Sequence, residues 1–189
     1  NSIFRLEAAH DCLDEGRPDR ARVALSGSFP GALAGEIRFL RAEALRAQGF
    51  FRRAQVDYRA ALKALGREDR DLVAGAFLGV ARCARSLGEV DCARQAMRRV
   101  RAAARKGDAD LLETLALEDA LVDRADGLYA KALKQFAPLL ESSRRRRDWS
   151  AVGFLLWATG GARRFSGDLE GSHRDFKDSL AAFRRVGDR

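Results

Sequence analysis

The sequence predicts an all-α protein made of about five helix pairs stacked in a row. Composition is the first observation: 34 of the 189 residues are Ala, whereas the β-branched residues are only nine Val, two Ile and two Thr. Alanine, leucine, arginine and glutamate favour helices, while strands are built largely from β-branched and aromatic side chains. The second observation is a repeat, because Gly16, Gly49, Gly88, Gly127 and Gly167 are 33, 39, 39 and 40 residues apart.

Three further columns of residues stay in phase with these glycines. Five residues after each glycine stands a small residue: Ala21, Ala54, Ala93, Ala132 and Ser172. Nine residues after it stands a large apolar one: Leu25, Tyr58, Met97, Phe136 and Phe176. Seven residues before it stands another small one: Ala9, Ala42, Ala81, Ala120 and Gly160. Each glycine is expected to end a helix in the left-handed conformation, and the small residues let two antiparallel helices approach. Since one pair cannot bury its apolar face alone, the pairs are expected to stack.

The phased columns place ten helices, separated by polar linkers such as GRED at 66–69 and KGDAD at 106–110. The expected helices are 3–14, 18–28, 34–47, 51–65, 71–86, 90–105, 109–125, 128–143, 149–165 and 168–185. They form a single repeat array over 1–189, with units at about 1–31, 32–68, 69–108, 109–147 and 148–189. Most linkers end near an Asp that can cap the next helix, and Asp110 with Glu113 fits a capping box.

Two prolines predict local departures from this regular pattern. Pro30, followed by Gly31, is expected to end the second helix of the first unit early. Pro138 falls inside the helix expected at 128–143, where it removes a hydrogen bond. We therefore expect that helix to be kinked or shortened.

The repeat resembles the tetratricopeptide repeat family. The pattern is A-x6-G-x4-A-x3-[FYLM], and AEALRAQGFFRRAQVDYRAAL at 42–62 matches it best. The resemblance covers essentially the whole chain and implies a right-handed α-solenoid. The period of 39–40 residues is similar to the extended repeats of bacterial signalling ATPases and transcription activators. One column departs from the family, since Asp123 and Arg163 stand where an aromatic residue is expected four before the glycine. The fourth and fifth units are therefore expected to shift register.

Charge and cysteine content bound the class of protein. The net charge of +8 comes from 30 Arg and five Lys, which suits an acidic partner, nucleic acid or an anionic membrane surface. The alternative is a GC-rich genome that spreads arginine over solvated helix faces. Three cysteines are too few for a disulfide framework, so a cytoplasmic location is the default expectation. The apolar run at 151–162 is too short to span a membrane. The chain begins without Met, and we expect it to be a fragment of a longer protein.

The sequence predicts no enzyme, cofactor or metal site. His10 and His173 are far apart in the array, and His10 and Cys12, two residues apart on one helix, face different directions. No metal-ligand spacing or phosphate-binding glycine motif is present, and TGGA at 159–162 follows no strand. Cys83 and Cys92 flank one turn, where core packing is the favoured interpretation and redox pairing the alternative.

The family resemblance implies a concave groove lined by the first helix of each unit. Three residues before the glycines stand Leu13, Arg46, Arg85, Arg124 and Arg164, so four of five are arginine. Six before stand Glu43 and Arg82, and ten before stand Phe39, Leu78, Leu117 and Trp157. Guanidinium groups bind carboxylates or phosphates in pairs of hydrogen bonds, so an acidic, partly hydrophobic peptide is the expected ligand. The alternative is that arginine near a helix C-terminus merely favours the helix dipole.

The sequence thus predicts a non-catalytic protein–protein interaction or scaffold module that binds a partner protein or acidic peptide in its groove. A second hypothesis is a regulatory or sensor segment of a larger signalling or transcription protein. A third is nucleic-acid binding through the basic surface, to which the run Arg144–Arg147 could contribute. The favoured interpretation of that run is structural, at the negative end of a helix, because the chain lacks interleaved aromatics for base stacking.

Overall fold

The computed structural model describes residues 2–66, 69–103 and 108–187, and every regular element within these ranges is a helix. The all-α prediction is confirmed. The chain forms two compact units, Asn1–Gly107 and Asp108–Arg189. The boundary between them falls at the predicted junction of the third and fourth repeats. No helix among the described residues is long and apolar enough to cross a membrane.

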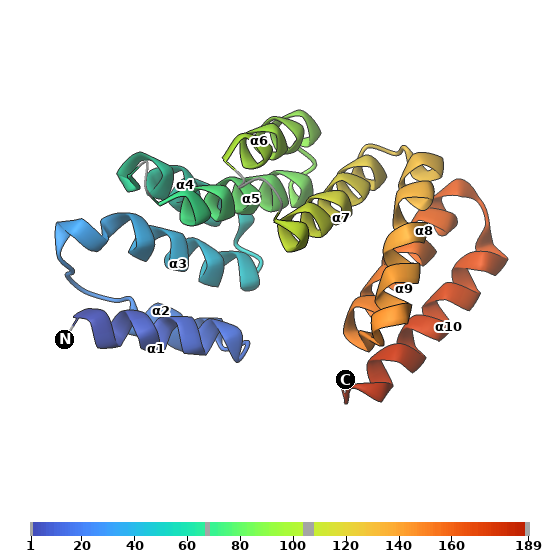
Figure 1. Ribbon diagram of the computed structural model, residues 1–189, viewed down its shortest axis with the longest axis horizontal. Coiled ribbons are helices and arrows are strands. Elements are labelled where there is room, and N and C mark those ends of the chain that lie inside the picture. The colour runs from blue at the N-terminus through green and yellow to red at the C-terminus, as the bar shows by residue number, and fades with distance from the viewer. Residues whose placement is uncertain (1, 67–68, 104–107, 188–189) are drawn as a thin grey trace. The chain divides into compact units, whose positions relative to one another are not determined.

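The first unit is a stack of antiparallel helix pairs (Figure 1). Its elements are α1 (Ser2–Asp14), α2 (Pro18–Ala24), the short 3-10 helix η1 (Gly31–Leu33), α3 (Ala34–Ala47), α4 (Phe51–Ala64), α5 (Arg70–Ser86) and α6 (Val90–Ala103). Each α-helix packs against the next in sequence, and α3 also contacts α1 and α5. The predicted end of the sixth helix at residue 105 lies outside the described residues.

The second unit contains α7 (Ala109–Ala125), α8 (Tyr129–Arg146), α9 (Trp149–Ser166) and α10 (Leu169–Arg185), again with each helix packed on the next. Most helix bounds agree with prediction to within one residue. Two differ more. The second helix, predicted over 18–28, ends at Ala24. Pro30 lies too far along the chain to be the residue that ends it. Pro138 does not shorten its helix, because α8 continues through it to Arg146.

The turn glycines behave as predicted. Gly16, Gly49, Gly88, Gly127 and Gly167 have φ angles of 66°, 80°, 76°, 77° and 91°. At every one of these turns the glycine N–H donates to the carbonyl three residues earlier. The next N–H donates to the carbonyl five residues before itself, with N–O distances of 2.7–3.0 Å. These are the paired bonds of the Schellman motif, which satisfy the last carbonyls of the first helix.

The phased columns form the core. All residues of the two small columns are buried, and Leu25, Tyr58, Met97 and Phe136 are at most 1% exposed. Phe176 is half-buried, and its ring lies 3.1 Å from the position that a Cβ on Gly160 would occupy. A larger residue at Gly160 would therefore displace the ring.

The expected register shift in the fourth and fifth repeats does not occur. Gly127 and Gly167 keep the turn conformation of the other repeats. The two charged residues are instead paired across their hairpins. Oδ2 of the buried Asp123 lies 2.9 Å from Nζ of Lys131, and Nη1 of Arg163 lies 3.0 Å from Oδ1 of Asp175. An ion pair thus stands at each position where the resemblance predicts an aromatic residue.

Aspartates cap three helices of the second unit, but not by the predicted capping box. Asp108, rather than Asp110, is the N-cap of α7, and its Oδ1 accepts a hydrogen bond from the Leu111 N–H at 2.9 Å. Asp148 and Asp168 cap α9 and α10 in the same way. Glu113 is therefore not needed at the cap, and it forms an ion pair with α8 instead.

Candidate binding sites

Two predicted groove residues of the first unit, Glu43 and Arg46, form a polar network with a core tyrosine. Nη2 of Arg46 donates to Oε2 of Glu43 at 2.6 Å, and Nε donates to the Tyr58 hydroxyl at 3.2 Å. The Tyr58 hydroxyl in turn donates to Oε1 of Glu43. Tyr58 lies on α4 and is fully buried, whereas Glu43 and Arg46 lie on α3. The network therefore links the two helices of this pair.

The protonation of this network is fixed by its surroundings. Burial raises the pKa of Tyr58, and the Glu43 carboxylate raises it further, so the phenol stays a neutral donor. Burial opposes the charged form of Arg46, but the Glu43 carboxylate and the hydrogen bonds outweigh it, and the pKa of Arg46 is raised. The charge of Arg46 is therefore balanced by that of Glu43, and both side chains share hydrogen bonds with the Tyr58 hydroxyl.

One of the other predicted groove residues of the first unit contacts this network. Phe39 packs against Tyr58 with ring centroids 6.0 Å apart. Leu78, Arg82 and Arg85, all on α5, are half-buried. Cys83 is buried, and burial raises its thiol pKa to about 11 although the charges of Arg46 and Arg85 oppose the rise. The structure thus brings Arg46 and Arg85 near one buried thiol, consistent with a packing role for Cys83.

In the second unit, an arginine and an aromatic pair meet on one face of α7 and α9, here named the α7–α9 face. The Arg124 guanidinium lies 5.0 Å from the centroid of the Trp157 ring, and its Nη1 donates to the Ala158 carbonyl at 3.5 Å. The Trp157 ring tilts against Phe154 at 5.7 Å and is 47% exposed. Arg164, also predicted, is exposed on α9.

A pocket of about 610 Å³ adjoins these residues within the second unit. Its apolar lining includes the predicted Leu117 together with Leu139, Phe154, Leu155 and Phe183. Asp110, Glu113 and Asp148 add carboxylates. The Ser143 hydroxyl, buried at the same pocket, has no hydrogen-bond partner among the described residues. The pocket can therefore take an apolar group, and the Ser143 hydroxyl lies buried in its wall.

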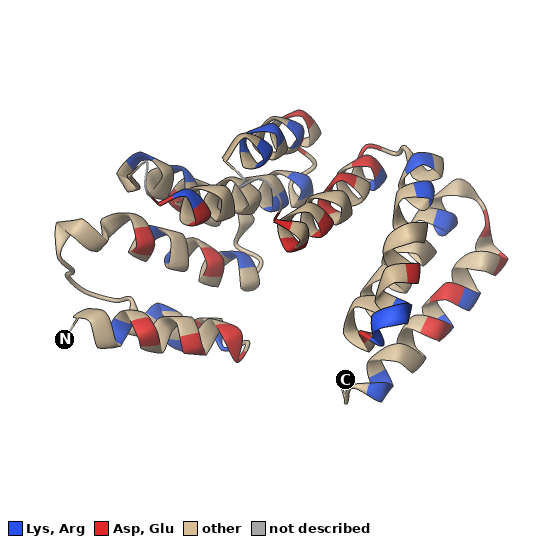
Figure 2. Cartoon of the chain, in the orientation of Figure 1, with Lys and Arg blue, Asp and Glu red and all other residues tan. Residues whose placement is uncertain are grey.

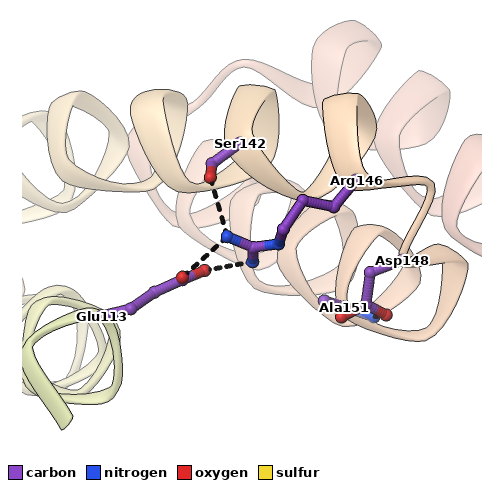
Figure 3. A network of polar contacts seen from close by, with 5 residues as sticks. All are labelled: Glu113, Ser142, Arg146, Asp148 and Ala151. Atoms are coloured by element: carbon purple, nitrogen blue, oxygen red, sulfur yellow. Dashed lines mark hydrogen bonds and ion pairs between the residues drawn. The ribbon is translucent and has the colours of Figure 1, made fainter. Parts of the chain in front are cut away.

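One side of this pocket is fixed by an ion pair between α7 and α8. Both Nη atoms of Arg146 contact the Glu113 carboxylate, at 2.8 and 2.6 Å, and Nη1 also donates to Ser142 at 3.0 Å (Figure 3). These hydrogen bonds lower the pKa of Glu113. Two residues of the run Arg144–Arg147 therefore have a structural role. Arg146 forms this ion pair, and Arg147 is the C-cap of α8 in the left-handed conformation.

This ion pair predicts an acid-dependent loss of stability. The folded pKa of Glu113 lies below its unfolded value of about 4.3, so its stabilisation is complete above that pH and is lost as the pH falls through the folded pKa. Glu113→Gln should therefore unfold with a weaker pH dependence than the parent between about pH 5 and pH 3. Urea midpoints followed by circular dichroism measure this. Glu141→Gln, which removes only an exposed pair with Arg145 within α8, is the matched control, and equal slopes for both variants would contradict the prediction.

Comparison with known proteins does not extend this description. No protein-family model, curated protein or solved structure matches the chain. The described residues also contain no group of three or more His, Cys, Asp or Glu placed to hold a metal ion. His10 lies 3.3 Å from Glu36 and links α1 to α3.

The sequence did not predict several of these contacts. Two of them join side chains from different helices: the bond between Arg46 and Tyr58, and the ion pair between Arg146 and Glu113. The third, the buried hydroxyl of Ser143, depends on how α8 packs within the second unit. A residue column records only spacing along the chain. The pattern does mark two of the partners, but it marks Tyr58 as a packing residue and Glu113 as a capping-box residue.

Proposed function

We propose that the chain is a non-catalytic, tetratricopeptide-like interaction module that binds a partner protein through the α7–α9 face of its second unit. The supporting observation is the half-exposed Trp157 ring, which contacts Arg124 and Phe154 beside a pocket with a largely apolar lining. Tryptophan and arginine are over-represented among residues that carry most of the binding energy of interfaces. A ring already fixed by neighbours loses little side-chain entropy on binding.

Charge favours a protein ligand over nucleic acid. Lys and Arg are spread over helices of both units and are interspersed with Asp and Glu (Figure 2). Helix α7 itself carries five carboxylates and only one arginine, Arg124. A surface that attracts phosphate backbones needs a continuous basic stripe, and α7 does not provide one. We place such a module in the cytoplasm as part of a signalling or transcription-regulator protein, where its partner would be another protein.

A displayed random-peptide library tests this proposal. Peptides selected on the parent protein should lose about tenfold or more in affinity on Trp157→Ala and on Arg124→Ala, because each change removes half of the stacked pair. Arg185→Ala is the matched control, since Arg185 stacks on Trp149 at 4.2 Å on another part of the same unit. Titration calorimetry gives the affinities, and circular dichroism checks that the variants fold. Selected peptides that bind all three variants as well as the parent would overturn the proposal.

A further inference from the structure

A second pocket, of about 630 Å³, lies in the first unit among α2, α3 and α4. Four arginines line it: Arg22 from α2, Arg41 from α3, and Arg52 and Arg53 from α4. None of them belongs to the arginine column that the repeat pattern singles out. The pocket is also separate from the Glu43–Arg46–Tyr58 network, whose residues are not among those that line it. It is here named the arginine pocket.

Two of these arginines, Arg22 and Arg41, donate hydrogen bonds to neutral acceptors. Nη1 of Arg22 donates to the Gln48 side-chain oxygen at 3.2 Å. Nε and Nη2 of Arg41 donate to the Leu25 carbonyl at 3.2 and 2.5 Å. These bonds orient the guanidinium groups without neutralising them, which is the arrangement that an anionic ligand can exploit.

The two α4 arginines are more open. The Arg53 guanidinium lies 5.8 Å from the centroid of the Phe50 ring. The Arg52 side chain is 81% exposed, and its Nη1 is 4.0 Å from Oε1 of Glu89, at the limit of an ion pair. Both can therefore turn toward a ligand at the mouth of the pocket.

Few acidic groups balance this charge. Among the residues that line the pocket, Asp57 is the one carboxylate. Burial raises the pKa of Asp57, while Arg38 and Arg41 act in the opposite direction. With Asp57 ionised, the four arginines face one carboxylate in the pocket lining, and Glu89 adds a second one 4.0 Å from Arg52. Charge complementarity thus specifies an acidic occupant.

The floor of the pocket is apolar and partly open to solvent. Leu25 and Leu45 line it with Val56, which is 64% exposed. Helix α2, which borders the pocket through Arg22, ends at Ala24 after seven residues. An occupant that buries Val56 must offer an apolar group as well as negative charge.

We propose that the arginine pocket binds an acidic segment of a partner protein, in which carboxylates flank an apolar side chain. The carboxylates contact the four guanidinium groups and the apolar side chain covers Val56. A small inorganic anion would leave that floor in water, and the pocket has no aromatic lining residue on which a base could stack. This inference rests on the proposed interaction function, but the two are tested on different units.

The probe is a fluorescein-labelled peptide of alternating Glu and Leu, titrated at physiological ionic strength and followed by fluorescence anisotropy. Binding should weaken about tenfold or more in the double variant Arg52→Glu, Arg53→Glu, because attraction becomes repulsion at two positions. The matched control is Arg98→Glu, Arg99→Glu, an adjacent exposed pair on α6 of the same unit with the same change in net charge. Methyl NMR should show that the peptide shifts the Val56 resonances.

Four results would overturn the proposal. Equal weakening in both double variants would show attraction by net charge alone. Equal affinity for a peptide with Ser in place of Leu would show that the apolar floor is not used. Oligo-dT that competes with the peptide as well as unlabelled peptide does would identify a nucleic-acid surface instead. Finally, the peptide could lose binding in Trp157→Ala and still bind fully to the Arg52→Glu, Arg53→Glu variant. That result would show that the acidic ligand binds the second unit and not the arginine pocket.

Discussion

Gly79→Ala should lower the free energy of unfolding of the first unit by about 3 kcal/mol. A Cβ at Gly79 would lie 2.2 Å from Cζ of the Tyr58 ring and within 2.6 Å of two other ring atoms. Tyr58 is fully buried, and its hydroxyl is hydrogen-bonded to Glu43 and Arg46. The ring has no space to retreat into, so α4 and α5 must move apart.

Gly75→Ala, one turn earlier on α5, is the matched control for this prediction. Its Cβ would lie 3.2 Å from Phe39, a half-buried ring that can shift by a few tenths of an ångström. Replacing a mid-helix glycine by alanine by itself gains roughly 0.5–1 kcal/mol, so Gly75→Ala should be neutral or slightly stabilising. Urea denaturation followed by circular dichroism compares the two. A Gly79→Ala protein as stable as Gly75→Ala would show that Tyr58 is not wedged against α5.

Arg46→Glu should also destabilise the first unit, by about 3 kcal/mol or more. The change removes the cation that compensates Glu43 and sets a second carboxylate beside it in a partly buried position. It also removes one partner of the Tyr58 hydroxyl. Thermal and urea unfolding should both show the loss.

Arg164→Glu is the matched control, because Arg164 stands in the same repeat column but is exposed on α9. Surface substitutions of this kind usually change stability by less than about 0.5 kcal/mol. Equal stability of the two variants would mean that the Glu43–Arg46–Tyr58 network contributes nothing. The comparison also bears on the groove hypothesis, since a binding loss after reversal of Arg46 would reflect lost structure.

The parts of the fold that were predictable depend on local backbone chemistry. Gly49 must be followed by a chain reversal because it takes a positive φ, and Ala42 and Ala54 must be small because two helices cross there. These requirements recur in every repeat, so they leave a phased pattern. The end of α2 at Ala24 is not marked by a column shared with the other repeats, because it depends on Ser26, whose hydroxyl donates to the Val23 carbonyl at 2.7 Å.

The candidate sites were less predictable because they depend on which side chains meet across helices. The carbonyl of Arg46 accepts the N–H of Gly49, which places Arg46 in the last helical turn, as the dipole interpretation of its column also expects. Spacing alone could not show that its guanidinium turns toward Tyr58. The arginine pocket combines residues from three helices, one of them the short α2, so no single column contains it. Whether the predicted column of four arginines binds a ligand stays a prediction.

The positions of the two tryptophans have a practical consequence. Trp149 and Trp157 are the only tryptophans of the chain, and both lie on α9 of the second unit. Intrinsic tryptophan emission is therefore a built-in optical reporter for Asp108–Arg189, whereas the far-ultraviolet signal averages over all helices. Coincident transitions in the two signals would identify one cooperative array, and separate transitions would identify two domains that melt independently, without any label or truncation.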